Sequence, residues 1–151
     1  MALSHIKIRP ATKKDTNAIL ELLYELGRPR PKNKSEKTRF EKQIMRYLTD
    51  KDKKILVAAS DSRLVGMASV IFIPKLNRTN PELYIPELIV ARGQRRSGVG
   101  KLLMDSCIGV AKKKKCFRLR LESGHQRKEA HRFYKKLRFE QSALTYTKKL
   151  K

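Results

Sequence analysis

The stretch Gln94-Arg95-Arg96-Ser97-Gly98-Val99-Gly100-Lys101 lies between an apolar strand, expected over residues 84–90, and an amphipathic helix. Two glycines at alternate positions let the backbone approach a ligand without a Cβ in the way. The helix adds unpaired first-turn amides and the positive end of its dipole, which both favour a bound anion. Arg95, Arg96 and Lys101 supply counter-charge. The stretch therefore predicts a phosphate-binding loop.

Two common nucleotide-binding motifs do not fit this loop. A P-loop needs Gly-x-x-x-x-Gly-Lys followed by Ser or Thr, a spacing that is absent here. A dinucleotide-binding fingerprint needs a third glycine where the chain has Leu103. What remains is Arg95-Arg96-Ser97-Gly98-Val99-Gly100, an Arg-x-x-Gly-x-Gly pattern after a strand. This pattern resembles the acetyl-CoA loop of the GNAT superfamily of acyl-CoA-dependent N-acetyltransferases.

A second stretch near the C-terminus carries the same resemblance. Residues 127–139 are similar to the family pattern Asn-x-x-Ala-x-x-Leu/Phe-Tyr-x-x-Leu-Gly-Phe, with Tyr134 at the tyrosine position. Arg127 replaces the family's Asn, and Arg138 replaces its Gly. The second change predicts that the turn after the last helix either accepts a side chain without strain or holds it in a left-handed conformation.

Apolar periodicity predicts the first half of the fold. A short strand around Ile6 and Ile8 precedes a helix that a Thr12-x-x-Asp15 capping box opens and Gly27 ends. A basic loop over residues 28–34 leads to a second helix, for which Ser35 is the expected N-cap. Strands over residues 55–59 and 64–73 are close enough in sequence to form an antiparallel hairpin.

The second half is expected to alternate strands and helices. After a loop over residues 75–81, the strand to Val90 and the glycine loop lead into a helix with an apolar stripe of Val99, Leu102, Leu103, Cys107 and Val110. A strand over residues 117–121, a helix with Ala130, Phe133, Tyr134 and Leu137 on one face, and one or two strands over residues 139–150 complete the chain. The strand, helix, strand unit predicts two parallel strands.

These elements predict an α/β protein of the α+β type, folded as a single domain over residues 1–151. The sheet is expected to be mixed and mostly antiparallel, with about four flanking helices. The order β-α-α-β-β-β-α-β-α-β resembles the GNAT fold from Ile6 to Leu150. That resemblance implies a central pair of parallel strands that splay apart around the cofactor.

Composition limits the partners and the location. The chain has 37 basic and 14 acidic side chains and a net charge of +23, so it favours anionic partners, although solubility alone also explains such a charge. Cys107 and Cys116 have no metal-site or disulfide spacing and are expected to be reduced thiols, so no metal is predicted. No run of residues is apolar enough to span a membrane, and no signal peptide is evident, which indicates a soluble cytoplasmic protein.

The resemblance implies direct attack of an amine on the thioester of acetyl-CoA. By analogy, amides of Arg95, Arg96, Ser97, Gly98, Val99, Gly100 and Lys101 bind the pyrophosphate, and Ile89 and Val90 pair with the pantetheine arm. Tyr134 is the expected general acid, with packing as the alternative role. Glu87 is the expected base, with a solvated or salt-bridged carboxylate as the alternative. Glu82 and Tyr84 are further candidates for the base.

Two functions follow from these observations. The first is an N-acetyltransferase that transfers acetyl from acetyl-CoA to a primary amine of a protein, a peptide or a small molecule. The second is a basic adaptor of the same fold that binds nucleic acid or ribosomes without catalysis, using residues 28–34 and 112–115. With 7% aromatic residues and no Trp, such binding would depend mainly on phosphate charge and would be sensitive to salt. The sequence leaves the oligomeric state open.

Overall fold

The computed structural model describes residues 2–151. Their contacts form two compact units, one ending at Arg120 and one over Leu121–Lys151, and each is described by itself. The main elements, in chain order, are β1 (Ile6–Pro10), α1 (Thr16–Glu25), α2 (Lys34–Thr49), β2 (Lys53–Ser60), β3 (Arg63–Ile73), β4 (Glu82–Val90), α3 (Val99–Lys113), β5 (Leu119–Leu121) and α4 (Lys128–Lys136). None of the helices in the described part of the chain has the length and apolar character needed to cross a membrane.

The sheet has the strand order β1-β2-β3-β4-β5. Strands β1 to β4 pair antiparallel with their neighbours, whereas β5 runs parallel to β4 after the α3 crossover. Backbone bonds of 3.0 Å from Leu83 N to Arg118 O and from Phe117 N to Pro81 O connect the β5 side to the beginning of β4. The mixed, mostly antiparallel sheet expected from the sequence is therefore confirmed.

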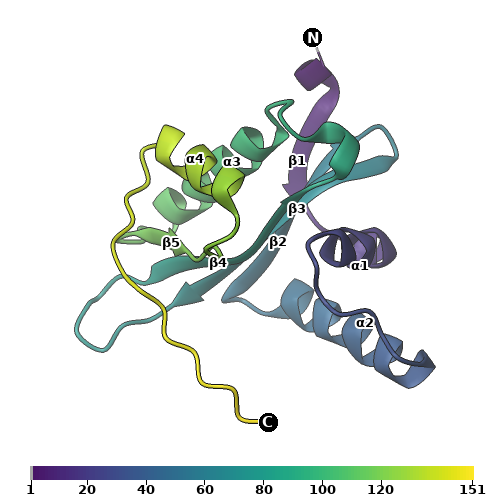
Figure 1. The fold of residues 1–151 in the computed structure, drawn as a ribbon, viewed down its shortest axis with the longest axis horizontal. Helices are drawn as coiled ribbons and strands as arrows, with labels where there is room; N and C mark the ends of the chain where they lie inside the picture. Colours follow the sequence, from purple (N-terminus) through teal and green to yellow (C-terminus); the bar gives the residue numbers. More distant parts are fainter. Residues whose placement is uncertain (1) are drawn as a thin grey trace. The chain divides into compact units, whose positions relative to one another are not determined.

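Helices cover both faces of the sheet in the first unit. Figure 1 shows α1 and α2 on one face of β2 and β3, and α3 on the other. Ile19 of α1 and Ile44 of α2 are buried against the first face, and Leu103 of α3 is completely buried. Each such side chain contributes roughly 1.5–3 kcal/mol by leaving water. On α3, Met104 and Ala111 are buried, whereas Leu102 and Val110 of the expected stripe are only half-buried.

The helix caps follow the sequence in one case and depart from it in another. Thr12 N donates to Asp15 Oδ2 at 2.8 Å, and this capping box opens a short 3-10 turn that leads into α1. Helix α2 begins at Lys34 because Asn33, whose side chain accepts from Glu36 N at 2.9 Å, is its N-cap. The prediction of Ser35 as the cap was wrong, since Asn33 precedes it with a suitable partner three residues later.

The C-terminal segment differs from the sequence prediction. No strand forms after Phe139 (Figure 1). Phe139 itself is half-buried, and residues 140–151 are all exposed. Leu144 and Tyr146 alternate with threonines, which is a strand pattern, yet they are 69% and 88% exposed. The predicted terminal strand was therefore wrong in this structure, because a strand also needs a neighbour for its amides and a surface for its apolar side chains.

Candidate active site

Strand β4 contains a β-bulge beside Pro86. Ser69 pairs with Glu87 and Ile71 pairs with Tyr84, so two residues of β4 lie opposite one residue of β3. Pro86 has no N–H to contribute to a ladder, which suits an interruption of the pairing. The extra residue puts Tyr84 and Glu87 on the same face of the sheet, although they are three positions apart.

The carboxylate of Glu87 contacts groups from two other segments, β3 and the loop after α1. Ser69 Oγ donates to Glu87 Oε1, and the backbone N of Glu87 donates to Ser69 Oγ at 3.1 Å. Arg28 Nη2 lies 3.5 Å from Glu87 Oε2 and also donates to Pro86 O at 3.3 Å. The Glu87 side chain is 23% exposed and that of Arg28 is 49% exposed. Sequence analysis did not identify Ser69 or Arg28, because these contacts join distant parts of the chain.

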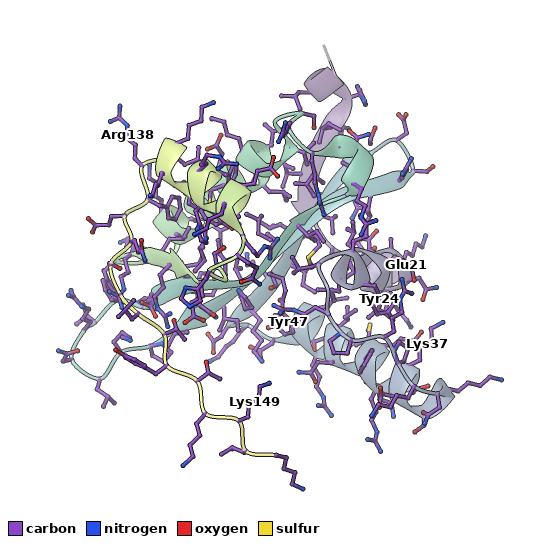
Figure 2. All side chains as sticks on the ribbon, viewed as in Figure 1. Glu21, Tyr24, Lys37, Tyr47, Arg138 and Lys149 are labelled. Carbon is purple, nitrogen blue, oxygen red and sulfur yellow. The ribbon has the colours of Figure 1, made fainter. Side chains whose placement is uncertain are left out.

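A cavity of about 440 Å³ lies between α1, α2 and the sheet, and Glu87 lines it. Most of its lining is apolar or aromatic, and Glu87 is the one carboxylate in it; the lining residues are Ile19, Leu20, Leu23, Tyr24, Arg28, Pro29, Phe40, Gln43, Ile44, Tyr47, Ile55, Met67, Ser69 and Glu87. Figure 2 labels Tyr24 on α1 and Tyr47 on α2. Burial raises the pKa of the Tyr47 phenol, and the charges of Glu87 and Asp50 raise it further. Tyr47 is therefore a neutral hydroxyl at neutral pH.

A second hollow, of about 370 Å³, lies where β4 ends. It is lined by Tyr24, Glu25, Arg30, Arg63, Ala91, Arg92 and Gly93, so it is much more basic than the cavity at Glu87. The backbone N of Arg92 donates to Glu25 Oε1 at 3.0 Å, which connects this end of β4 to α1. The Arg30 guanidinium lies 4.7 Å from the centre of the Tyr24 ring.

The glycine loop ends where α3 begins. Gly98 is the N-cap of α3 and has a φ of +94°, a conformation that glycine adopts without strain. A Cβ on Gly98 would lie 2.9 Å from Leu3 Cδ1. Arg96 also has a positive φ, of +64°, which is uncommon for a side chain of its size. The backbone of the predicted phosphate-binding loop thus has the special geometry that its glycines indicate.

Arg95 and Lys101, which were expected to supply counter-charge, contact protein groups. Arg95 Nε donates to Val90 O at 3.2 Å, and Lys101 Nζ forms an ion pair of 2.9 Å with Asp105. Ser97 Oγ donates to Gln94 O within the loop. These contacts hold the side chains of Arg95, Ser97 and Lys101 against groups of the protein.

Close packing behind the loop depends on a glycine that sequence analysis did not identify. A Cβ on Gly66 would lie 3.0 Å from Ile89 O and 3.0 Å from Leu103 Cδ1. Gly66 pairs with Val90 across β3 and β4, next to the pairing of Met67 with the buried Ile89. The missing side chain lets α3 approach the end of β4, which positions the loop between them.

Tyr134 belongs to the second unit, where it packs against two aromatic rings. Its ring centre is 5.3 Å from that of Phe133 in an edge-on arrangement and 5.8 Å from that of Phe139. Burial raises the pKa of the Tyr134 phenol, and the positive charge of Arg127 opposes that shift. The phenol is therefore protonated at neutral pH, as a proton donor must be.

The turn after α4 is left-handed. Arg138 has a φ of +67°, which confirms the second of the two conformations expected where the family has Gly. Its N–H donates to Lys135 O at 2.9 Å, and Phe139 N donates to Tyr134 O at 3.0 Å. These two bonds close the helix directly beside Tyr134.

The alternative base Glu82 is an ion-pair residue in this structure. Its side chain is fully buried and accepts from Arg118 Nε at 2.5 Å and from Arg120 Nε at 2.8 Å, with Lys75 Nζ at 3.9 Å. Burial by itself raises the pKa of Glu82, but the hydrogen bonds and charges of Arg120 and Arg118 outweigh burial and lower it. The Arg120 guanidinium also lies 4.6 Å from the centre of the Tyr84 ring.

Both cysteines are free thiols. Burial raises the pKa of Cys107 to about 12 and also raises that of Cys116, although Lys114 opposes the second shift. Neither thiol is activated as a nucleophile at neutral pH, because the reactive form is the thiolate. Within residues 2–151, no group of three His, Cys, Asp or Glu side chains is arranged to hold a metal ion.

Known proteins are similar to this chain in sequence and in fold. The Acetyltransferase (GNAT) family profile matches residues 18–139. The chain is 28% identical over 144 residues to an aminoalkylphosphonate N-acetyltransferase of Salmonella typhimurium, an alignment that covers 95% of this chain and 91% of that protein.

Two solved structures have a fold similar to that of this chain. A putative acetyltransferase from Agrobacterium tumefaciens superposes with a TM-score of 0.83 at 22% identity, covering 95% of this chain and 99% of the other. Glucosamine-6-phosphate N-acetyltransferase from Arabidopsis thaliana superposes with a TM-score of 0.81 at 19% identity, covering 97% and 99%. These structures establish the fold, and the match over residues 18–139 establishes the family: the chain is an acetyltransferase of the GNAT family.

Proposed function

We propose that this acetyltransferase transfers an acetyl group from acetyl-CoA directly to a primary amine, and that residues 1–151 work as one domain. The observation that carries the proposal is the position of Glu87, whose carboxylate lines a cavity large enough for a small acceptor. The relative from Salmonella typhimurium is named for an amine substrate, which agrees with this reaction class. Cytoplasmic location stays a prediction from the sequence.

We assign cofactor binding to the glycine loop and the end of β4. Backbone amides from Arg95 to Lys101 would hold the pyrophosphate at the beginning of α3, where Gly98 leaves the backbone accessible. Ile89 and Val90 would pair with the pantetheine arm as an added strand. Arg95, which donates to Val90 O at 3.2 Å, would then give up that bond. Acetyl-CoA supplies the activated acetyl group as its thioester.

Glu87 would receive the proton that the amine loses. An alkylammonium has a pKa of about 10.4 and no lone pair, so it must first lose one proton to solvent before the neutral amine attacks. Glu87 would then accept, directly or through a water, the second proton, which becomes acidic as the C–N bond forms. Ser69 contacts Oε1 of the carboxylate, and Oε2, which lies 3.5 Å from Arg28 Nη2, would face the amine or the water once Arg28 moves away. Removing that proton as the C–N bond forms prevents the product from carrying a positive charge.

Tyr134 would assist the thiolate that leaves when the C–S bond breaks. A thiol has a pKa of about 8.5 and a phenol about 10, so complete transfer from the phenol is uphill by roughly 2 kcal/mol. The phenol therefore acts mainly as a hydrogen-bond donor that stabilises developing negative charge on sulfur. Its raised pKa keeps the proton in place for this purpose.

The test is a titration with acetyl-CoA followed by a screen of amines, in which free thiol release reports turnover. We expect thiol release that depends on the amine and that falls at least about 100-fold in Glu87→Gln, the range typical of a lost general base. CoA binding should be unchanged in that variant. Tight CoA binding without turnover of any amine would instead support the basic adaptor that binds nucleic acid or another polyanion.

A further inference from the structure

The walls of the cavity at Glu87 favour an apolar ligand. Ile19, Ile44 and Met67 are 0%, 7% and 1% exposed, and Phe40 from α2 adds a half-buried aromatic ring. An apolar group placed among them gains roughly 25 cal/mol per Å² removed from water. A hydroxyl-rich or charged group would lose its hydration without enough partners to replace it. The body of the acceptor should therefore be apolar.

The single carboxylate limits the charge of that ligand. Glu87 is the one acidic side chain among the residues that line the cavity. A second or third ammonium group, as in a polyamine or an aminoglycoside, would be buried without a counter-ion, which is costly. The overall charge of +23 adds to the repulsion of such polycations. The cavity therefore suits one ammonium group.

Arg28 marks the place of that ammonium group. Its guanidinium lies 3.5 Å from Glu87 Oε2, so a cation already occupies the position beside the carboxylate. Because the Arg28 side chain is 49% exposed, it can turn into water at low cost when another cation arrives. The pair is thus replaceable rather than a fixed part of the core.

Apart from Arg28, which already pairs with Glu87, the arginines that would suit an acidic substituent lie outside this cavity. Arg30, Arg63 and Arg92 line the separate hollow at the end of β4, and none of them lines the cavity at Glu87. We propose that the acceptor is a primary amine with a single ammonium group on an apolar body and no acidic group, as in an arylalkylamine. This proposal rests on the proposed transfer to an amine beside Glu87, and it names the class of that amine.

The experiment compares three compounds that each carry a primary amino group but differ in charge: 2-phenylethylamine, spermidine and 2-aminoethylphosphonate. Initial rates at saturating acetyl-CoA give kcat and KM for each amine. Binding of each amine to the CoA complex is measured by calorimetry, independently of turnover. We expect kcat/KM for 2-phenylethylamine to exceed the other two values at least about tenfold, which is a modest discrimination for an apolar pocket.

Two variants of α2 test whether the amine binds against the apolar lining of the cavity at Glu87. Phe40→Ala removes a ring that lines the cavity and should raise KM and the dissociation constant for 2-phenylethylamine about tenfold. Leu48→Ala is the matched control, because Leu48 packs against the core from the same helix without lining the cavity. It should leave both constants unchanged at a temperature where each variant is folded.

Arg28→Gln tests whether Arg28 competes with the ammonium group for Glu87 or instead binds an acidic substituent of the ligand. Removing a competing cation from Glu87 should lower KM for 2-phenylethylamine about twofold to fivefold, the effect of one exposed pair. If Arg28 instead binds an acidic substituent, KM for 2-aminoethylphosphonate rises in this variant.

The outcomes separate this proposal from the proposed function. Preferred turnover of spermidine or 2-aminoethylphosphonate would overturn the apolar class and leave the acetyl transfer intact. Binding of 2-phenylethylamine that Phe40→Ala weakens, without turnover of any amine, would support the class and overturn the transfer. Binding that neither Phe40→Ala nor Arg28→Gln changes would overturn the placement of the amine in this cavity.

Discussion

Tyr134 combines a protonated phenol with a position between two rings, and its replacement tests which property matters. Tyr134→Phe keeps the ring that contacts Phe133 and Phe139, so folding and CoA affinity should be nearly unchanged. We expect kcat to fall by about 10² to 10⁴ at neutral pH if the hydroxyl assists the leaving thiolate. The deficit should shrink at high pH. A rate equal to that of the parent across the pH range would leave Tyr134 as a packing residue only.

A substitution at Gly98 tests whether the glycine loop binds the pyrophosphate of CoA. Gly98→Val forces a branched side chain into a φ of +94° and against Leu3, so it should weaken CoA binding at least about tenfold. Gly109→Ala, in the same helix where a Cβ meets no atom within 4 Å, is the control and should bind CoA normally. Calorimetric titration with CoA on folded protein measures both. Unchanged affinity in Gly98→Val would exclude this loop as the pyrophosphate site.

Among the structural elements, α4 ends in a strained backbone conformation at Arg138, and replacement of Arg138 by Gly should relieve the strain. Arg138 adopts a φ of +67°, which costs a non-glycine residue roughly 1–2 kcal/mol. Arg138→Gly should therefore raise the free energy of unfolding by about 0.5–1 kcal/mol, after the entropy that glycine loses on folding. Lys135→Gly, within the same last turn, should lower it. Urea unfolding curves of both variants give the comparison, and destabilisation by Arg138→Gly would show that the arginine side chain contributes more than its backbone costs.

The elements also show which parts of this molecule a sequence can predict. The capping box at Thr12, the stop at Gly27 and the loop at Gly98 are local, because neighbouring residues decide them through backbone conformation and short-range hydrogen bonds. The contact of Arg28 with Glu87 spans 59 positions and depends on how α1 packs on the sheet. The cavity has no sequence pattern of its own, since its lining reads as ordinary core. The strand pattern at Leu144 and Tyr146 lacked the partner that a strand requires.

At the scale of the whole first unit, the buried carboxylate of Glu82 couples stability to pH. Its folded pKa is lowered below the unfolded value of about 4.3, so its contribution is present above that pH and is lost as the pH falls through the folded pKa. Asp15, held by Arg9 at 2.7 Å, behaves in the same way. We expect the free energy of unfolding to decrease below about pH 4.

Glu82→Gln tests this coupling. It leaves Arg118 and Arg120 without their anion. The loss should cost about 3 kcal/mol at pH 7, the lower end of the range for a buried pair, because both arginines are partly exposed. The variant should also lose less stability than the parent between pH 5 and pH 3. Denaturant midpoints at several pH values measure both effects, and an equal acid-induced loss in the variant would assign the coupling to other carboxylates.

The extended C-terminal segment has a further consequence, for the lifetime of the chain in the presence of proteases. A protease needs extended, accessible backbone, and residues 140–151 are exposed and include Lys148 and Lys149, the second of which Figure 2 labels. Brief trypsin treatment should therefore cleave there before it cleaves inside the sheet, as intact mass would report. Protection of these sites would mean that a partner strand covers the segment in solution. Proteolysis from this end would therefore first remove positive charge, while the helices and the sheet stay intact.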